Sequence, residues 1–365
     1  MTKKIGILTW HHYHNFGSRL QAYALYKYLS NLSLYVQLIN YRDMKLNLII
    51  WIKYIILGIL IKFPYFICKG VKKDVLYASL KFERNYLPQT GLLCTSRSLS
   101  KHSKRYDSII CGSDQIWAPN VYNPIYMLDF VPDNVNKVSY AASIGLESIP
   151  DNLVDDYKKY IGRLNHISVR EERGKEILKS QCSIDAIVVL DPTLLLPKVE
   201  WDKIKKQSKI KEKYIFCYFL KKDHKYKKLV KEFAEENGYE IYGISDKNDD
   251  SLWMHIYDFK TVGPCEFIGL IEGAVGVFTD SYHGTIFSML YHKPFTLFER
   301  FSCGDNINQN SRIEQLKSYF GIDNNVVKAD SVSSVVLNSI NYEEFEHTLE
   351  ELRGYSAAFL KKALS

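Results

Sequence analysis

The chain has 365 residues, which is long for a single hydrophobic core and sufficient for two domains. Its hydrophobic content of 46% and charged content of 24% are ordinary for a globular protein and give no sign of a low-complexity chain. The net charge of +7 favours anionic partners such as phosphorylated substrates or acidic lipid headgroups, and no nucleic-acid-binding module is recognisable, so we expect no nucleic-acid partner.

The first predicted strand covers residues 4–9, and a helix follows at 20–29, where apolar residues recur at helical spacing. The loop between them contains Gly17 and four basic or titratable residues: His11, His12, His14 and Arg19. Such a loop receives anions, because the N–H groups at a helix start are free and the helix dipole is positive there. It matches neither the Walker loop nor the dinucleotide-binding glycine pattern. No Cys or carboxylate cluster accompanies the histidines, so we expect no metal.

Residues 46–68 form an apolar stretch that contains Trp51 and is interrupted by Lys53, Lys62 and Pro64. A continuous membrane span needs about 20 apolar residues, and the interruptions leave this stretch short of that. One interpretation is a segment that lies in the bilayer interface, with its aromatic rings and lysines among the headgroups. The other is a helix buried in the domain or in a dimer.

A further motif follows a predicted strand near Ile109 and reads Gly112-Ser113-Asp114-Gln115. A carboxylate and an amide at the carboxyl end of a strand are suited to holding sugar hydroxyls or to accepting a proton. The alternative is that Asp114 only caps the next helix.

The most informative segment follows an apolar run at residues 274–278, which predicts a buried strand. A short polar turn leads into a helical pattern with Ile286 and Leu290, so His283 lies between strand and helix. Ligands of open α/β sheets bind at this edge. An imidazole beside anion-binding N–H groups indicates acid or base chemistry on a phosphate or carboxylate substrate. The alternative is a histidine that only caps the helix or lies at the surface.

Strands and helices alternate along the chain, which predicts an α/β fold of two Rossmann-like domains with parallel sheets and right-handed crossovers. Strands are expected around Ile5, Val36, Ile109, Val138 and Ile167, and at residues 186–190, 214–219, 239–243, 274–278 and 295–298. The predicted domains are 1–195 and 196–340, followed by a C-terminal segment, 341–365, that contains an amphipathic helix at 342–360.

Six segments together resemble, in order, the motifs of the polysaccharide pyruvyl transferase family: residues 15–25, 111–117, 139–145, 168–171, 189–193 and 280–284. The resemblance runs from residue 4 to about 320, and six motifs in order are far more specific than one. It implies a GT-B-like fold with a cleft between an acceptor-binding first domain and a donor-binding second domain, and a last helix that packs back on the first domain. It also implies phosphoenolpyruvate as donor, a sugar of a surface polysaccharide as acceptor, and no cofactor.

The implied chemistry assigns roles to individual residues. Phosphoenolpyruvate is electrophilic at C2 once its methylene carbon is protonated, so a general acid is needed, and His283 is the candidate. Asp114 is the candidate that takes the proton of the acceptor hydroxyl. Donor binding is expected from Arg170, Ser281, Gly284, Thr285, Lys293, Arg300 and Arg312, since basic groups and helix N–H groups hold phosphate and carboxylate. Acceptor binding is expected from His14, Asn15, Gly17, Ser18, Arg19, Ser113 and Gln115.

One position departs from the family pattern. Many members carry Arg two positions before the His, where this chain has Ser281, so that either Arg300 or Arg312 takes over or the donor differs. Two other functions therefore stay open: a GT-B-type glycosyltransferase that uses a nucleotide sugar, and a non-catalytic scaffold of a polysaccharide-assembly complex. No acidic pair late in the second domain is placed for ribose recognition, and a scaffold is not expected to keep His283, Asp114 and Arg170 together.

Cysteine usage and the first residues bear on location. Seven cysteines, without any C-x-x-C pair, argue against a disulfide framework or a zinc site and favour a reducing cytoplasm. We expect no signal peptide, because a predicted strand containing Lys4 begins almost at once. We expect a bacterial capsule or exopolysaccharide enzyme whose acceptor is a polyprenyl-diphosphate-linked glycan. Peripheral, salt-sensitive binding to the inner face of the cytoplasmic membrane would bring it to that acceptor.

Overall fold

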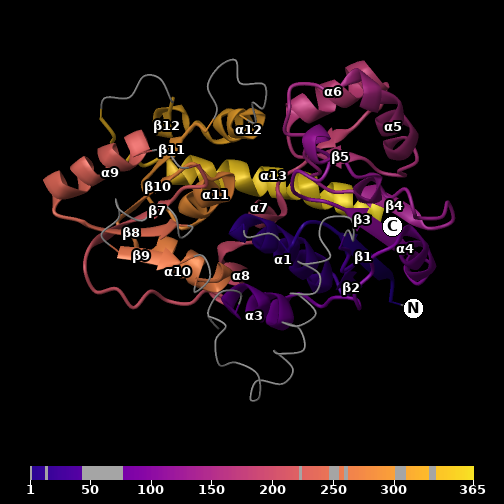
Figure 1. Ribbon diagram of the computed structural model, residues 1–365, viewed down its shortest axis with the longest axis horizontal. Helices are drawn as coiled ribbons and strands as arrows, with labels where there is room; N and C mark the ends of the chain where they lie inside the picture. The colour runs from indigo at the N-terminus through magenta and orange to yellow at the C-terminus, as the bar shows by residue number, and fades with distance from the viewer. Residues whose placement is uncertain are drawn as a thin grey trace.

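The computed structural model of the chain describes residues 2–12, 15–42, 77–221, 224–245, 255–258, 262–300, 310–328 and 334–365. His14 and the apolar stretch 46–68 lie outside these residues. Figure 1 shows two α/β lobes side by side, one from each half of the chain, with the long C-terminal helix lying across both.

The first lobe is built on parallel strands with the bounds β1 (Lys4–Leu8), β2 (Tyr35–Leu38), β3 (Ser108–Cys111), β4 (Asn136–Ser139), β5 (Ser168–Val169) and β6 (Ile187–Val188). The first four form one sheet in the order β2-β1-β3-β4, in which Ile5 pairs with Val36 on one side and with Ser108 on the other. β5 and β6 pair with each other. A parallel bridge between Ala142 and Val169 connects β5 to the segment that follows β4. All residues of β3 are buried, as in a parallel sheet covered on both faces.

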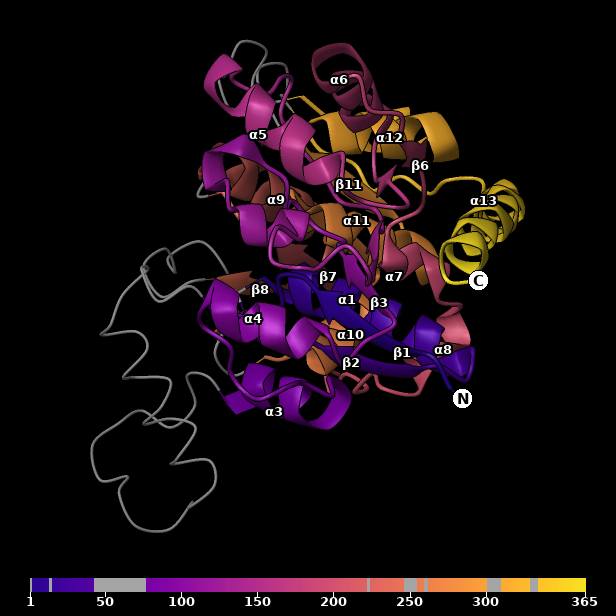
Figure 2. The same ribbon diagram turned by 90° about the vertical axis from the view of Figure 1, so that its right-hand side faces the viewer.

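The helices of this lobe are α1 (Phe16–Asn31), α3 (Tyr77–Tyr86), α4 (Ser96–Ser103), α5 (Asp151–Ile161) and α6 (Glu172–Cys182), with short 3-10 turns η2 (Pro119–Val121) and η3 (Pro124–Met127). α1 begins after Asn15, whose side chain accepts a hydrogen bond from the Gly17 N–H, and all of its first ten residues are buried. α1 contacts elements of both lobes. Its N-terminus lies at the boundary between the lobes, because Gly17 contacts His283 of the second half of the chain. Figure 2, in which the first lobe faces the viewer, shows the long C-terminal helix nearly end-on at one side of the molecule.

The second lobe has a parallel sheet in the order β12-β11-β10-β7-β8-β9. Its elements are β7 (Tyr214–Tyr218), α9 (His224–Asn237), β8 (Glu240–Ser245), β9 (His255–Asp258), α10 (Pro264–Gly273), β10 (Gly276–Thr279), α11 (Tyr282–Leu290), β11 (Phe295–Phe298), α12 (Ser311–Phe320), η4 (Asp323–Asn325) and β12 (Val326–Val327). The strands predicted from apolar runs are the inner ones. The sequence analysis did not predict β9 and β12, which form the two edges; β12 is only two residues long and half-buried.

The two lobes share one core. α7 (Pro192–Leu195) and α8 (Lys198–Asp202) connect them, and Trp201 of α8 packs against Phe287 at a ring-centroid distance of 4.9 Å and against Tyr23 at 5.6 Å. A single cluster of buried apolar residues runs from Ile5 in the first sheet to Phe216 in the second. The boundary between the lobes is therefore apolar packing as well as polar contact.

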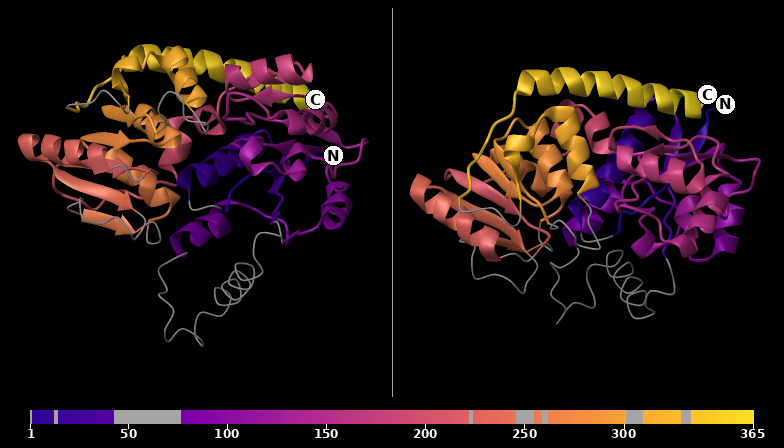
Figure 3. Two further views of the ribbon diagram at one scale, coloured as in Figure 1. Left: turned by 45° about the horizontal axis from the view of Figure 1, so that its top comes forward. Right: turned by 90° about the horizontal axis from the view of Figure 1, so that it is seen from above.

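α13 (Tyr342–Ala363) begins beside α12, where Phe345 contacts Phe320, and ends against the first lobe. Its Arg353 donates to the carbonyls of Leu194 and Leu196 in the connection between the lobes. Its last turn accepts hydrogen bonds from Asn136 of β4, and Figure 3 shows the helix spanning both lobes. Within the described ranges, no helix combines the length and the apolar character needed to cross a bilayer.

Candidate active site

His283 is the second residue of α11 and is only 3% exposed. Ser281 caps the helix by accepting a hydrogen bond from the Gly284 N–H at 3.3 Å, and Thr285 donates its hydroxyl to the Ser281 carbonyl. A side chain at Gly284 would meet Thr279 at 2.6 Å, so that a glycine is needed where the helix approaches the end of β10. These contacts fix the imidazole at the carboxyl edge of the second sheet, where the sequence predicted it.

The N-terminus of α1 meets the N-terminus of α11 at this histidine. A Cβ atom added to Gly17 would lie 2.0 Å from Nδ1 of His283 and 2.5 Å from its Cγ, so the backbone of Gly17 lies directly against the ring. Two helix N-termini, one from each lobe, thus converge on one point. Because each carries a partial positive charge and free N–H groups, their meeting point attracts an anion.

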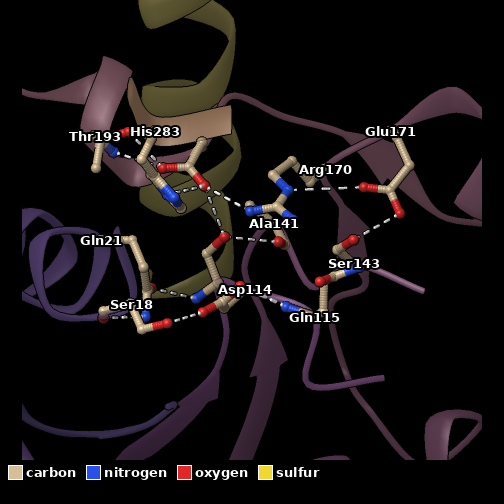
Figure 4. Close-up of polar contacts among 12 residues, drawn as sticks. Ser18, Gln21, Asp114, Gln115, Ala141, Ser143, Arg170, Glu171, Thr193 and His283 are labelled. Carbon is tan, nitrogen blue, oxygen red and sulfur yellow. Dashed lines mark hydrogen bonds and ion pairs between the residues drawn. The ribbon is translucent and has the colours of Figure 1, made fainter. Parts of the chain in front are cut away.

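Asp191 holds the other side of the imidazole. Its Oδ2 lies 3.6 Å from Nε2 of His283 and 3.0 Å from Nη1 of Arg170, and it accepts a hydrogen bond from the Ser113 hydroxyl at 3.2 Å. Its Oδ1 accepts from the backbone N–H and the hydroxyl of Thr193. Burial opposes ionisation of this carboxyl, but the charges of His283 and Arg170 outweigh burial and hold its pKa below its usual range. Figure 4 shows the side chains of Arg170, Thr193 and His283 close to one another.

Two guanidinium groups face the ring of Tyr282, the residue next to His283. The Cζ atom of Arg170 lies 4.7 Å from the ring centroid, and that of Arg312, from α12, lies 5.7 Å away. Both arginines are buried, and burial together with the charges of Arg170 and Arg300 lowers the pKa of Arg312 to about 9. Nη2 of Arg170 is buried without a hydrogen-bond partner among the described residues. A cluster of this kind is stabilised by a bound anion, which relieves the repulsion between like charges.

Glu171 limits the positive charge of this cluster. One of its oxygens accepts hydrogen bonds from the hydroxyl of Ser143 and from the backbone N–H groups of Ile144 and Gly145, at 2.9, 3.1 and 3.2 Å. The other lies 3.8 Å from Nε of Arg170. Arg170 is therefore fixed between two buried carboxylates with its planar fork oriented, and Figure 4 shows it between them.

Asp114 lies on the first-lobe side of the site and adopts a positive φ of 76°. Its Oδ2 accepts the hydroxyl of Ser18 at 2.6 Å, and its Oδ1 accepts the backbone N–H of Gln115 at 2.9 Å. The neighbouring Ser113 N–H donates to Gln21 of α1 at 3.1 Å. The loop after β3 is thus fastened to the first turns of α1, as Figure 4 shows, and both oxygens of Asp114 are already engaged.

The structure separates some predicted site residues from His283. Lys293 lies beyond the far end of α11 and donates to the carbonyl of Ala274 at 3.0 Å, at the amino end of β10. It therefore lies at the opposite end of α11 from His283, and this helix extends about 13 Å from one end to the other. Arg19 pairs with Glu83 of α3 at 2.9 Å, within the first lobe.

Arg300 lies at the end of β11, and its carbonyl accepts a hydrogen bond from Lys221 at 2.9 Å. Asp280 accepts the backbone N–H groups of Leu220 and Lys221 at 2.7 and 2.8 Å, which fastens the loop after β7 to the start of α11. Ser281 stands where many family members carry an arginine, and Arg300 and Arg312 are the candidates to replace that arginine. Of these two, Arg312 faces the Tyr282 ring together with Arg170.

Asp191, Glu171 and Tyr282 are site residues to which the sequence alone gave no role. Each follows a motif residue or lies inside a motif, and Asp191 precedes a proline at the end of β6 and caps α7. A strand end followed by Asp-Pro-Thr is the one signal that pointed to it. No group of three or more His, Cys, Asp or Glu side chains in the described part of the chain is placed to hold a metal ion.

Comparisons with known proteins bear on the family and the fold. The family model described as polysaccharide pyruvyl transferase matches residues 15–300. No curated protein matches the sequence. The structure is similar to that of a putative UDP-N-acetylglucosamine 2-epimerase from Listeria monocytogenes, with a TM-score of 0.51 and 9% sequence identity over 100% of this chain and 91% of that chain.

Two further structures are similar at lower scores. UDP-GlcNAc 2-epimerase from Methanocaldococcus jannaschii has a TM-score of 0.49 at 12% identity, over 96% of this chain and 92% of that one. E. coli ADP-heptose LPS heptosyltransferase II has a TM-score of 0.42 at 13% identity, over 95% and 99%. At such identities, the likeness to the Listeria protein shows the fold alone, which is the GT-B-like pair of Rossmann-like domains that the sequence predicted.

Proposed function

This chain belongs to the polysaccharide pyruvyl transferase family, and on that premise we propose that it transfers the enolpyruvyl group of phosphoenolpyruvate to two hydroxyls of one sugar. The product is a pyruvate ketal, and phosphate is released. The sugar belongs to a surface polysaccharide precursor that is carried on a polyprenyl diphosphate.

One observation carries this proposal: two helix N-termini and two buried arginines surround a single histidine. The donor has a phosphate and a carboxylate, and the site offers two kinds of partner for them. The N-termini of α1 and α11 provide N–H groups, while Arg170 and Arg312 provide guanidinium groups on the Tyr282 ring. His283, which lies where the two helices meet, is then close to the reacting carbons of the donor.

The chemistry follows from the contacts of His283. Asp191 lies beside Nε2 at 3.6 Å, and its negative charge stabilises a positive charge on the ring. The imidazolium protonates the methylene carbon of the donor, and a sugar hydroxyl adds to C2. A second hydroxyl of the same sugar then replaces phosphate, which closes the ketal ring. Ser113 and Thr193 hold Asp191 in place throughout.

The test is incubation of the purified protein with phosphoenolpyruvate and a panel of lipid-linked sugars. We expect phosphate release together with the mass gain of a ketal. We also expect thermal stabilisation by phosphoenolpyruvate alone, since a ligand at 100 times its dissociation constant adds about 2.7 kcal/mol. Stabilisation only by UDP or GDP sugars would replace the proposal with a nucleotide-sugar glycosyltransferase, and no binding of either donor would favour the scaffold.

Location at the membrane surface forms part of the same proposal. The stretch 46–68, which lies outside the described residues, offers Trp51, Ile55 and Leu60 in an apolar context with two lysines. We expect the protein to float with anionic liposomes at low salt, and the triple change Trp51→Ser, Ile55→Ser and Leu60→Ser to abolish flotation. A wild-type protein that stays in the unbound fraction at low salt would contradict the proposal.

A further inference from the structure

A second titratable cluster lies at the carboxyl end of β1, apart from His283 and Asp191. It consists of His11 and His12 in the loop, Arg19 on α1, Arg42 after β2, and Glu83 on α3. The rings of His11 and His12 face each other with centroids 3.6 Å apart. The proposed reaction needs a proton acceptor on the first-lobe side, and nothing described above assigns a role to these histidines.

Glu83 organises this cluster. Its Oε1 accepts from Nε of Arg19 at 2.9 Å, and its Oε2 lies 3.2 Å from Nδ1 of His12. The residue is 5% exposed. Burial alone would raise its pKa, but His12 and Arg19 outweigh burial and lower the pKa of Glu83 to about 2, so that it is a carboxylate at neutral pH.

The contacts of the two rings bear on which nitrogen carries the proton. A carbonyl only accepts, so His11 donates from Nδ1 to the carbonyl of Thr9 at 3.0 Å. Nδ1 of His12 has two partners: Oε2 of Glu83 can only accept from it, and Nη2 of Arg42 can only donate to it. In the tautomer of His12 that donates to Glu83, as in neutral His11, Nε2 carries a lone pair. Nε2 of both histidines is buried without a hydrogen-bond partner among the described residues.

Both histidines are held neutral at neutral pH. Burial lowers the pKa of each, although the charge of Glu83 acts in the opposite direction. Nη2 of Arg42 lies 3.0 Å from Nδ1 of His12, and its charge opposes a second proton on the ring, as does the charge of Arg19. A neutral imidazole that is fixed through Nδ1 by a carboxylate, with Nε2 unengaged, has the arrangement of a general base.

We propose that His12, oriented by Glu83, accepts the proton of the acceptor hydroxyl, and that the loop after β1 is therefore part of the acceptor site. The proposal rests on the proposed function. In the step, the hydroxyl O–H bond breaks and its proton passes to Nε2 of His12, while the oxygen forms a bond to C2 of the donor. The electron pair of the C2–C3 double bond takes a proton from His283. Phosphate leaves only when the second hydroxyl attacks.

Two observations favour His12 over Asp114, the residue that the sequence suggested. Both oxygens of Asp114 already accept hydrogen bonds, from Ser18 and from Gln115, and the residue is buried. Nε2 of His12 has no hydrogen-bond partner among the described residues, and its loop leads directly into α1, whose Gly17 lies against His283. His12 is thus on the first-lobe side of the same helix N-terminus that contacts the general acid.

The experiment compares His12→Asn and His12→Gln with the wild type. The amide of Asn can donate to Glu83 from nearly the position of Nδ1 but has no atom in place of Nε2. A purely structural role is therefore preserved in His12→Asn, whereas a base is lost. His255→Gln is the matched control, because His255 also contacts a glutamate, Glu240, at 3.2 Å, but on the exposed edge of the second sheet.

We expect both His12 variants to keep thermal stabilisation by phosphoenolpyruvate and to lose about 10²- to 10⁴-fold in kcat. The residual activity should lack the acidic limb of the wild-type pH profile, and the control should match the wild type. A His12→Asn enzyme within threefold of the wild type overturns the proposal, as does a His12 variant that loses donor stabilisation together with activity. A wild type that releases no phosphate from phosphoenolpyruvate would instead overturn the proposed function.

Discussion

The loops after β1 and after β10 share one local pattern but use their histidines differently. Each leads from a strand into a helix with an N-cap side chain, Asn15 before α1 and Ser281 before α11. His283 lies inside its helix, enclosed by Gly17 and Asp191. His12 lies in the loop, and its Nε2, like that of His283, has no hydrogen-bond partner among the described residues. The lesson is that the partner carboxylate, which comes from a distant part of the chain, differentiates two similar turns.

The pairing with carboxylates differs between the two histidines in a way that bears on their roles. Asp191 faces Nε2 of His283, whereas Glu83 faces Nδ1 of His12. The first arrangement stabilises a charged ring beside an anion site. In the second, burial outweighs the charge of Glu83 and keeps the ring of His12 neutral, and the tautomer that donates to Glu83 has its lone pair on Nε2. Acid and base would thus lie on opposite lobes of one site, and four experiments test this contrast.

The largest effect is expected from removing the imidazole of α11. We expect His283→Gln to lower kcat by about 10²- to 10⁴-fold while donor binding and folding persist, because the residue is needed for proton transfer and not for the anion contacts. Steady-state kinetics and thermal shift with phosphoenolpyruvate measure the two properties. An unfolded or fully active variant would support a mere helix-capping role.

Gly17→Ala tests how closely the two lobes must approach. The new Cβ would lie 2.0 Å from Nδ1 of His283, so the ring must move, and a displacement of about 1 Å at a reacting group can cost 10²-fold in rate. The matched control is Gly354→Ala in α13, where a Cβ meets nothing within 4 Å. We expect that control to be fully active and about 0.5–1 kcal/mol more stable in urea denaturation. Equal activity of the two variants would show that the His283 ring can move away from residue 17 without loss of function.

Arg170 tests whether the anion site depends on a guanidinium fork or only on charge. Arg170→Ala leaves Asp191 and Glu171 without their cation, so we expect a loss of stability of about 3–5 kcal/mol as well as weaker donor binding. Arg170→Lys keeps the charge but loses the fork, so its donor dissociation constant should lie between those of Ala and the wild type. Calorimetric titration with phosphoenolpyruvate measures it. If both variants bind the donor as the wild type does, Arg170 is structural.

The smallest effect is a pH dependence of stability at the β1 loop. The pKa values of His11 and His12 lie below the ordinary value of 6.5, so the unfolded chain binds more protons below that pH and the free energy of unfolding falls as the pH decreases. Each histidine contributes about 1.4 kcal/mol per pH unit until its folded pKa is reached. Glu83, whose pKa is lowered, contributes stability that is lost only as the pH falls from its ordinary value of 4.5 towards 2.

Urea denaturation between pH 8 and pH 5 separates these two contributions. His12→Asn should show a shallower fall than the wild type over this interval, since one titrating group is removed. Glu83 remains ionised throughout the interval and does not add to the slope there. An unchanged slope in His12→Asn would mean that His12 is not held neutral by burial.

Much of the fold was predictable because buried parallel strands have long apolar runs. Tyr214–Tyr218 and Gly276–Thr279 form inner strands of the second sheet, as their sequences predict. The edge strands β9 and β12 were missed, since they have only four and two residues and so give little apolar signal. The family resemblance supplied the GT-B arrangement, which alternation alone does not specify.

The sequence by itself determined which residues follow strands and begin helices, and so it located His283, Asp114 and Ser18 at sheet edges. Tertiary packing decided the rest. Lys293 is close to His283 in sequence but lies at the opposite end of α11, whereas Asp191 and Glu83 are remote in sequence from the imidazoles that they hold. The physical reason is that helix and strand signals are local, while the charge state of a buried imidazole depends on partners brought by elements that only the folded core places beside it.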